Sequence, residues 1–150
     1  MARVIERQIT IDAPAEKVFS YLADLTRHEE WAAHPLRIQQ TSEGPVGPGT
    51  TFTSVGRQFG RDNEDKIIVT EIVPSEKIVF ESEGRAGRFR HHFLLQEEDG
   101  GTRLTKGVEL VKLSLLLRLL TPIVAVFRVT ARGFDGDLER IKTKLEGGTS

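Results

Sequence analysis

Short runs of alternating apolar and polar residues fill much of the first 111 positions of the chain. These runs are rich in Val, Ile, Phe and Thr, and residues of the Gly, Pro, Asp and Ser type separate them. They cover residues 2–11, 36–41, 50–59, 66–73, 77–83, 88–96 and 103–111. A period of two is typical of a strand with one buried face, and short connections between consecutive strands predict antiparallel hairpins.

Helical patterns follow the first of these runs and the last. Pro14 suits the first turn of a helix after the first strand, and a short second helix is expected over residues 26–33. From residue 120 to residue 145, apolar side chains recur every three or four positions, which predicts one long helix over about residues 121–146. We expect its polar side to carry Asp137, Glu139, Arg140, Lys142 and Lys144.

Two predicted turns in the middle of the sheet define a register. If Pro74-Ser75 and Arg85-Ala86 are two-residue turns, Val69 lies opposite Phe80, and Phe80 lies opposite His91. Both turns then place the same apolar set on one face, namely Ile67, Val69, Ile78, Phe80, Phe89, His91, Phe93 and Leu95. The other face receives Lys66, Lys77, Glu81, Glu83, Arg88, Arg90 and His92. Because strand side chains alternate, this agreement between two turns supports the register.

These elements together predict an α+β fold. A long C-terminal helix covers the apolar face of an antiparallel sheet, and two short helices follow the first strand. A chain of 150 residues suits one domain with a substantial core. We expect this domain to span residues 1–146 and residues 147–150 to form a flexible tail.

Composition and charge argue against several classes of function. The chain has 21 basic and 22 acidic residues, so its net charge is −1, whereas a general nucleic-acid binder is usually basic. Cysteine is absent, which excludes disulfides, thiolate metal sites and thiol catalysis and fits a reducing compartment. We therefore expect a cytoplasmic protein with no nucleic-acid partner.

The chain shows no signal for secretion or for membrane insertion. Residues 1–7 contain no apolar segment of the kind found in secretory signals. The most apolar stretch, Leu113–Phe127, includes Arg118 and Pro122, and its uninterrupted run is well short of the roughly 18 residues of a spanning helix. No transmembrane segment is expected, although contact with a membrane surface stays open.

Several segments, in this order, resemble one protein family. They are residues 9–19, residues 22–31 ending in a tryptophan, residues 101–105, and the stretches 119–122 and 138–146 at the two ends of the last helix. They resemble the polyketide cyclase/dehydrase branch of the START-like superfamily, also called SRPBCC or helix-grip. The resemblance implies a curved antiparallel sheet wrapped around the long C-terminal helix, with a cavity between them for an apolar small molecule. Its members include lipid carriers and aromatic polyketide cyclases, and fold alone does not choose among such functions.

Two ionisable residues are candidates for chemistry. His91 lies on the apolar face of the register, where burial disfavours its charged form and leaves a neutral imidazole that can carry a proton. The alternative is a core histidine bonded to a backbone carbonyl or a water. Glu71 falls on the same face near the hairpin end, as a general base or as a rim residue. Neither Ser54 nor Ser82 has a readable partner for a catalytic triad.

Other polar residues suggest no metal or cofactor site. His92 should face away from His91, no two histidines share ligand spacing, and neither a metal nor a cofactor is expected. A basic group on neighbouring hairpins comprises Arg57, Arg61, Arg85, Arg88 and Arg90. We expect the nearby acids to neutralise it as a solvated face, the alternative being an anionic ligand. Those acids are Glu64, Asp65, Glu81 and Glu83.

Three functions follow from these observations. The first is a protein that binds an apolar or amphipathic small molecule, such as a lipid, an isoprenoid or an aromatic metabolite. The expected cavity walls are Trp31, Phe52, Val69, Phe80, Phe89, His91, Phe93, Leu120, Val124 and Phe127. The second is a cyclase or dehydratase with His91 as acid and base, which needs at least two convergent polar groups. The third is an interaction module that exposes Leu113–Leu120 as an apolar patch, so that a monomer and a homodimer both stay open.

Overall fold

The computed structural model describes residues 3–32, 36–58, 61–85, 87–115, 119 and 123–147, and the backbone alone for residues 3, 58, 61 and 123–129. Within these residues seven strands form one antiparallel sheet in the order β1-β7-β6-β5-β4-β3-β2. The strands are β1 (Arg3–Ile11), β2 (Leu36–Gln40), β3 (Thr51–Gln58), β4 (Arg61–Val73), β5 (Lys77–Gly84), β6 (Gly87–Glu98) and β7 (Gly101–Leu113). The helices are α1 (Ala15–Ala23), the 3₁₀ helix η1 (Leu25–Glu30) and α3 (Ile123–Gly147).

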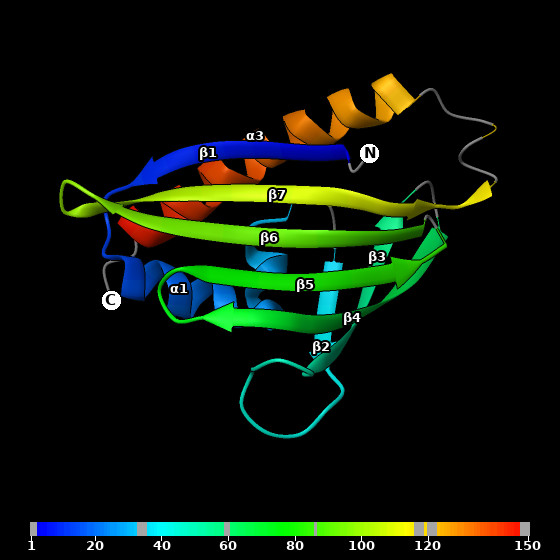
Figure 1. Ribbon diagram of the computed structural model, residues 1–150, viewed down its shortest axis with the longest axis horizontal. Coiled ribbons are helices and arrows are strands. Elements are labelled where there is room, and N and C mark those ends of the chain that lie inside the picture. Colours follow the sequence, from blue (N-terminus) through cyan, green and yellow to red (C-terminus); the bar gives the residue numbers. More distant parts are fainter. Residues whose placement is uncertain are drawn as a thin grey trace.

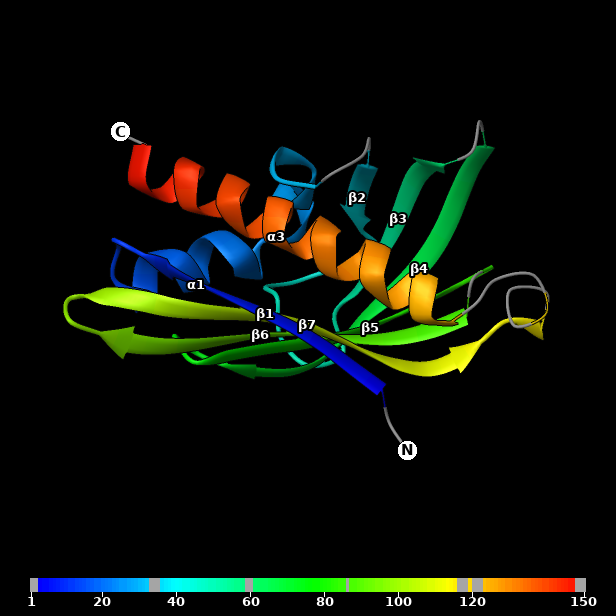
Figure 2. The same cartoon turned by 90° about the horizontal axis from the view of Figure 1, so that it is seen from above.

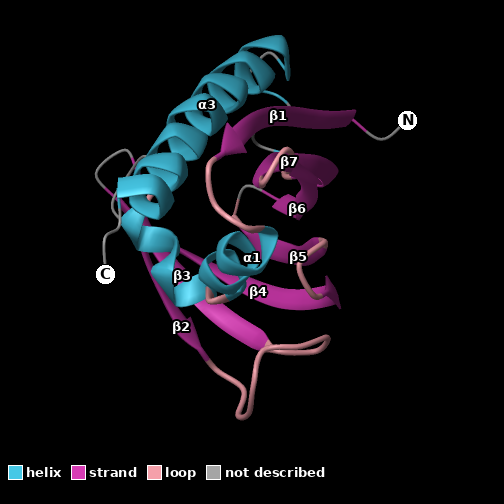
Figure 3. Ribbon diagram, turned by 90° about the vertical axis from the view of Figure 1, so that its left-hand side faces the viewer, coloured by secondary structure: helices cyan, strands magenta, loops and turns pink. Residues whose placement is uncertain are grey.

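The sheet curves around the long helix. The strands lie side by side in Figure 1, and Figure 2 shows α3 running obliquely over the sheet while β2 and β3 rise on the same side. In the end view of Figure 3, α3 spans the open side of the curve, with α1 inside it. This is the helix-grip architecture that the sequence predicts. Gly147, which the prediction assigns to a flexible tail, is the last residue of α3, and residues 148–150 lie outside the described part.

The predicted register of the central strands is confirmed. Val69 lies opposite Phe80, Phe80 opposite His91, and Ile78 opposite Phe93. The prediction for Glu71 is wrong, because the first turn has three residues and a bulge between Val69 and Glu71 absorbs the extra one. The bulge places Glu71 opposite Val79 instead of Ile78 and turns its side chain to the exposed face.

Strand β4 begins earlier than its apolar pattern indicates. Residues 61–65 are polar, so the sequence places the start of the strand at Lys66, yet these residues pair with β3 from Gln58 to Ser54. Backbone pairing does not require apolar side chains, and the neighbouring strand supplies the hydrogen bonds. The extension matters because it brings Asp65 onto the inner face of the sheet, opposite Ser54.

The core lies between the concave face of the sheet and the helices. Helix α3 contributes Phe134, Leu138, Ile141 and Leu145, which are 7%, 1%, 0% and 5% exposed and follow helical spacing. Full burial of a side chain of this size contributes about 1.5–3 kcal/mol. This stripe fixes which side of α3 faces the sheet.

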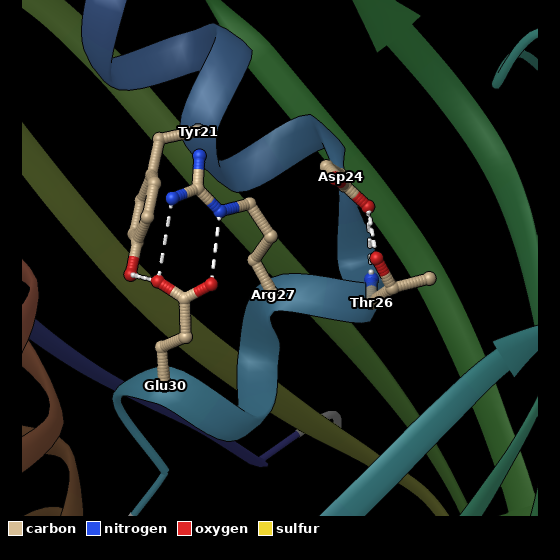
Figure 4. Close-up of polar contacts among 5 residues, drawn as sticks. All are labelled: Tyr21, Asp24, Thr26, Arg27 and Glu30. Carbon is tan, nitrogen blue, oxygen red and sulfur yellow. Dashed lines mark hydrogen bonds and ion pairs between the residues drawn. The ribbon is translucent and has the colours of Figure 1, made fainter.

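The junction of α1 and η1 is held by a group of polar contacts (Figure 4). The Tyr21 hydroxyl donates to Glu30 over 3.1 Å, and Arg27 Nε donates to the same carboxylate over 3.0 Å. Burial, helped by the Glu30 charge, raises the pKa of Tyr21 to about 12. The Asp24 carboxylate accepts from the Thr26 backbone N–H at the start of η1. These contacts set the position of Trp31, which follows η1 and is 2% exposed.

Candidate functional site

A cavity of about 410 Å³ lies between α3 and the concave face of the sheet. Its walls come from η1, from strands β2 to β6 and from α3. The lining residues are His28, Ala32, Leu36, Ile38, Ser54, Asp65, Ile67, Phe80, Ser82, His91, Thr130, Gly133, Phe134 and Asp137. The cavity therefore combines a mainly apolar surface with a few polar side chains, which is the usual character of a small-molecule site.

His91 lies on the sheet wall of this cavity and is held from two sides. Its Nε2 and the Ser82 hydroxyl are 3.0 Å apart, a hydrogen bond between adjacent strands. Its ring stacks on Phe80, with ring centroids 4.8 Å apart and planes 12° apart. The residue is half-buried and is one of those that line the cavity. Burial, with a smaller contribution from Lys106, lowers the pKa of His91 to about 3, so its imidazole is neutral near pH 7.

The bond between Ser82 and His91 corrects the sequence analysis, which found no partner for this serine. Ser82 lies directly opposite Phe89 and therefore diagonal to His91 on the same face. Diagonal neighbours in a sheet are within reach of longer side chains. The two residues form a pair of polar groups, and no carboxylate of the described residues is bonded to either of them.

A buried lysine, Lys106, lies behind the helical wall of the cavity. It is 5% exposed and lies opposite Phe93 on β6. Leu104, Lys106 and Val108 alternate along β7, so all three share its inner face. Its Nζ is 3.8 Å from the centroid of the Phe134 ring, 5.5 Å from that of Trp31 and 5.6 Å from that of Phe93. Burial lowers the pKa of Lys106 to about 8, and the nearby carboxylate of Asp137 opposes that effect.

Asp137 completes this buried group from α3. Its Oδ2 is 3.9 Å from Lys106 Nζ, and its Oδ1 accepts from Arg140 over 2.8 Å. Arg140 Nε also donates to the Trp31 carbonyl over 2.6 Å, which links α3 to the end of η1. The sequence places Asp137 on the polar side of the helix, and this is wrong. Asp137 is 8% exposed because it lies three residues after Phe134 and four before Ile141, within the buried stripe.

The sequence analysis missed Lys106 and Asp137 as residues of the site. The sequence does carry a signal for their burial. Each of the two charged residues occupies a position that the repeat of apolar residues around it assigns to the buried face. Extending the register from β6 into β7 would have placed Lys106 on the inner face.

Asp65 is the second carboxylate on the cavity wall. It is half-buried, lies opposite Ser54, and burial raises its pKa. The sequence assigns it to the acids that neutralise the arginines of the outer face, and this is wrong. The prediction is confirmed for two of the other acids, because Arg88 pairs with Glu83 at 3.1 Å and Arg90 with Glu81 at 3.5 Å.

The structure places the predicted wall residues in three environments. Phe80 and His91 line the cavity, and Phe89 is half-buried beside it without being one of its lining residues. Four others pack in the core instead, because neighbouring side chains cover them: Trp31, Phe52, Val69 and Phe93. Leu120 and the side chains of Val124 and Phe127 lie outside the described residues. Glu71, the second catalytic candidate, forms an exposed ion pair with Lys77 at 3.1 Å.

A larger groove of about 580 Å³ opens between β3, β4 and β5. Most of its charged side chains belong to the outer face, where Arg88 pairs with Glu83 in solvent. We regard the inner cavity as the candidate site, because His91, the residue whose pKa burial changes most, lies on its wall together with the half-buried Asp65. In the described residues, no group of His, Asp or Glu is placed to hold a metal ion, and no helix is long and apolar enough to cross a membrane.

The predicted interaction patch is exposed at two of the three leucines that the structure describes there. Leu115 and Leu119 are 70% and 75% exposed, whereas Leu113 is buried at 8%. Residues 116–118 and Leu120 lie outside the described residues. The use of this segment as a partner surface stays a prediction.

Comparison with known proteins gives a family and several similar structures. The sequence model of the family described as "Polyketide cyclase / dehydrase and lipid transport" matches residues 2–146. No curated protein matches the sequence. Among solved structures, the chain is similar to the ZhuI aromatase/cyclase from Streptomyces sp. R1128, with a TM-score of 0.78, 20% identity, and coverage of 97% of this chain and 94% of that one.

Two further structures have the same fold. Ara h 8.0201 gives a TM-score of 0.75 at 16% identity, over 99% of this chain and 100% of that one. The protein TTHA0849 from Thermus thermophilus gives a TM-score of 0.75 at 17% identity, over 99% and 100% of the two chains. At such identities the likeness shows the fold and leaves the function to the residues of the site.

Proposed function

The chain belongs to the polyketide cyclase / dehydrase and lipid transport family, and we propose that it binds a small amphipathic molecule in the cavity between α3 and the sheet. The observation that carries this proposal is the lining of the cavity. Leu36, Ile38, Ile67, Phe80 and Phe134 supply apolar walls, and a few polar groups converge between them. The volume of about 410 Å³ lies in the range of roughly 300–1,000 Å³ common for small-molecule sites.

The two kinds of lining residue have different tasks. Burial of the apolar part of a ligand contributes about 25 cal/mol per Å² before the costs of ordering it. The polar groups fix its orientation, since an unpaired buried polar group is costly. In this proposal the neutral imidazole of His91 and the hydroxyl of Ser82 contact the ligand through hydrogen bonds rather than through charge.

Extraction of the purified protein followed by mass spectrometry tests the proposal. We expect an apolar or amphipathic compound in an amount close to that of the protein, and displacement of a bound apolar fluorophore by that compound. An empty protein that also fails to bind the fluorophore would contradict it.

A cavity-filling variant sharpens this test. Gly133 lines the cavity, and a Cβ built there meets nothing within 4 Å, so Gly133→Leu begins in open space, takes up part of the cavity and favours the helix. We expect Gly133→Leu to abolish binding and to keep the melting temperature. Gly147→Leu is the matched control, because Gly147 is also free of neighbours within 4 Å but lies at the exposed end of α3.

A second candidate function is a cyclase or dehydratase. The observation that favours it is the His91–Ser82 pair on the cavity wall, which offers a neutral imidazole within reach of a bound substrate. Incubation with a cyclisable aromatic polyketide and analysis of the products by mass spectrometry tests it. Turnover that survives His91→Ala unchanged would exclude this role for the histidine.

A further inference from the structure

We propose that the molecule bound in the cavity carries a hydrogen-bond donor, a hydroxyl or a protonated amine, and that Asp65 receives it. The inference rests on the proposed function and adds the chemical class of the ligand's polar group. It makes Asp65 the residue that sets the preference for that group.

The cavity contains two carboxylates, and they differ in their partners. Asp137 has a partner on each oxygen, Arg140 at 2.8 Å and Lys106 at 3.9 Å. Asp65 makes no hydrogen bond or ion pair with any residue that the structure describes, although it is half-buried. A carboxylate that loses part of its water without gaining donors from the protein is destabilised, so a ligand that supplies a donor is favoured there.

The protein backbone makes room for Asp65 at this place. A Cβ on Gly84, on the adjacent strand, would overlap Asp65 Oδ1, so the absence of a side chain at Gly84 lets the carboxylate lie across β5. Ser54 lies opposite Asp65 on β3, and Ser82 with its partner His91 lies on the same wall. These groups form a polar end of the cavity, beside the apolar surface of Ile67 and Phe80.

The charge of the lining disfavours an anionic ligand. The ionisable residues that line the described cavity are the two carboxylates Asp65 and Asp137 and the two histidines His28 and His91, and burial keeps His91 neutral. Lys106 and Arg140 contact Asp137, and neither belongs to the lining. Among the lining residues that the structure describes, a ligand carboxylate therefore meets no lysine or arginine, whereas an ammonium group or a hydroxyl finds Asp65.

Three probes of equal chain length test this preference. Decylamine, decanol and decanoic acid compete at pH 7 with the neutral fluorophore N-phenylnaphthylamine. We expect the amine and the alcohol to displace it at concentrations about tenfold or more below that of decanoic acid, the ratio that one hydrogen bond to a charged group supplies. Equal displacement by all three probes would overturn this inference alone. If the protein binds none of them and no fluorophore, both this inference and the proposed function fail.

Two variants connect the preference to Asp65. Asp65→Asn should remove the advantage of decylamine over decanoic acid, and Gly84→Ala should weaken it at unchanged charge, because the new methyl group displaces the carboxylate. Glu64→Gln is the matched control, since it removes one carboxylate from the exposed face of the same strand. A ranking that survives both Asp65→Asn and Gly84→Ala would overturn the inference.

Discussion

The two faces of the sheet place ionisable side chains in opposite environments. On the outer face, Arg88 pairs with Glu83 and Lys77 with Glu71, through side chains that are 38–64% exposed. On the inner face, Lys106 is enclosed by aromatic rings and His91 stacks on Phe80, and both have strongly lowered pKa values. Both faces carry ionisable side chains. Burial therefore distinguishes the charges that lie in solvent from the groups that form part of a site.

The largest loss of stability is expected when a buried charge on the inner face loses its ion-pair partner. Asp137→Ala removes the carboxylate next to Lys106 and leaves a buried ammonium without compensation, which should cost about 3–5 kcal/mol of the free energy of unfolding. Urea denaturation at pH 7 measures it. The double variant Lys106→Met/Asp137→Ala should recover much of this loss, and a double variant as unstable as the single one would contradict the explanation.

The next largest change in stability is expected at acidic pH. The pKa of His91 is about 3 in the folded protein and about 6.5 unfolded, so between these values the unfolded chain binds more protons. Stability is therefore fully present above pH 6.5 and falls on acidification, by about 2 kcal/mol from pH 6.5 to pH 5. His91→Gln should remove this loss in urea denaturation, and His92→Gln, on the opposite face of β6, should leave it in place.

A change in stability of similar size is expected at alkaline pH. The pKa of Lys106 is about 8 when folded and about 10.5 when unfolded, so stability attributable to this residue rises with pH between these values. Relative to Lys106→Met, the wild-type protein should gain about 2 kcal/mol between pH 8 and pH 9.5. A difference between the two proteins that does not change with pH would show that Lys106 titrates normally.

The smallest effect is expected on the outer face. Arg88→Ala breaks an ion pair between half-exposed side chains, which is worth less than about 1 kcal/mol. The same urea assay at low and high salt measures it, and salt should reduce the difference further. A loss as large as that of Asp137→Ala would remove the contrast between the two faces.

The sequence analysis predicts the elements and much of the register, because both are local. The period of two in residues 77–83 and 88–96 and the turn between them place Phe80 opposite His91, as the structure shows. The prediction fails at Glu71, where one extra turn residue is absorbed by a bulge. A bulge changes the face of a side chain without changing the apolar pattern around it, so the sequence carries no clear signal for it.

The candidate site is predicted only in part. His91 is found because it occurs among phenylalanines, whereas Asp137 looks like one of the polar residues of an amphipathic helix and Asp65 like one of many surface acids. Their shared cavity depends on how α3 crosses the sheet and on the extension of β4 to Arg61, which brings Asp65 opposite Ser54.

The chain's own pattern of apolar and polar residues thus determined the strands, the helices, the hairpin pairing and the family. The tertiary structure decided which ionisable side chains are buried, which of them meet, and that a cavity lies between them. The physical reason is the distance along the chain between the residues that determine each feature. Secondary structure follows from neighbours a few residues apart, whereas burial and the resulting pKa changes of Lys106 and His91 arise from elements that are distant in sequence and packed together in space.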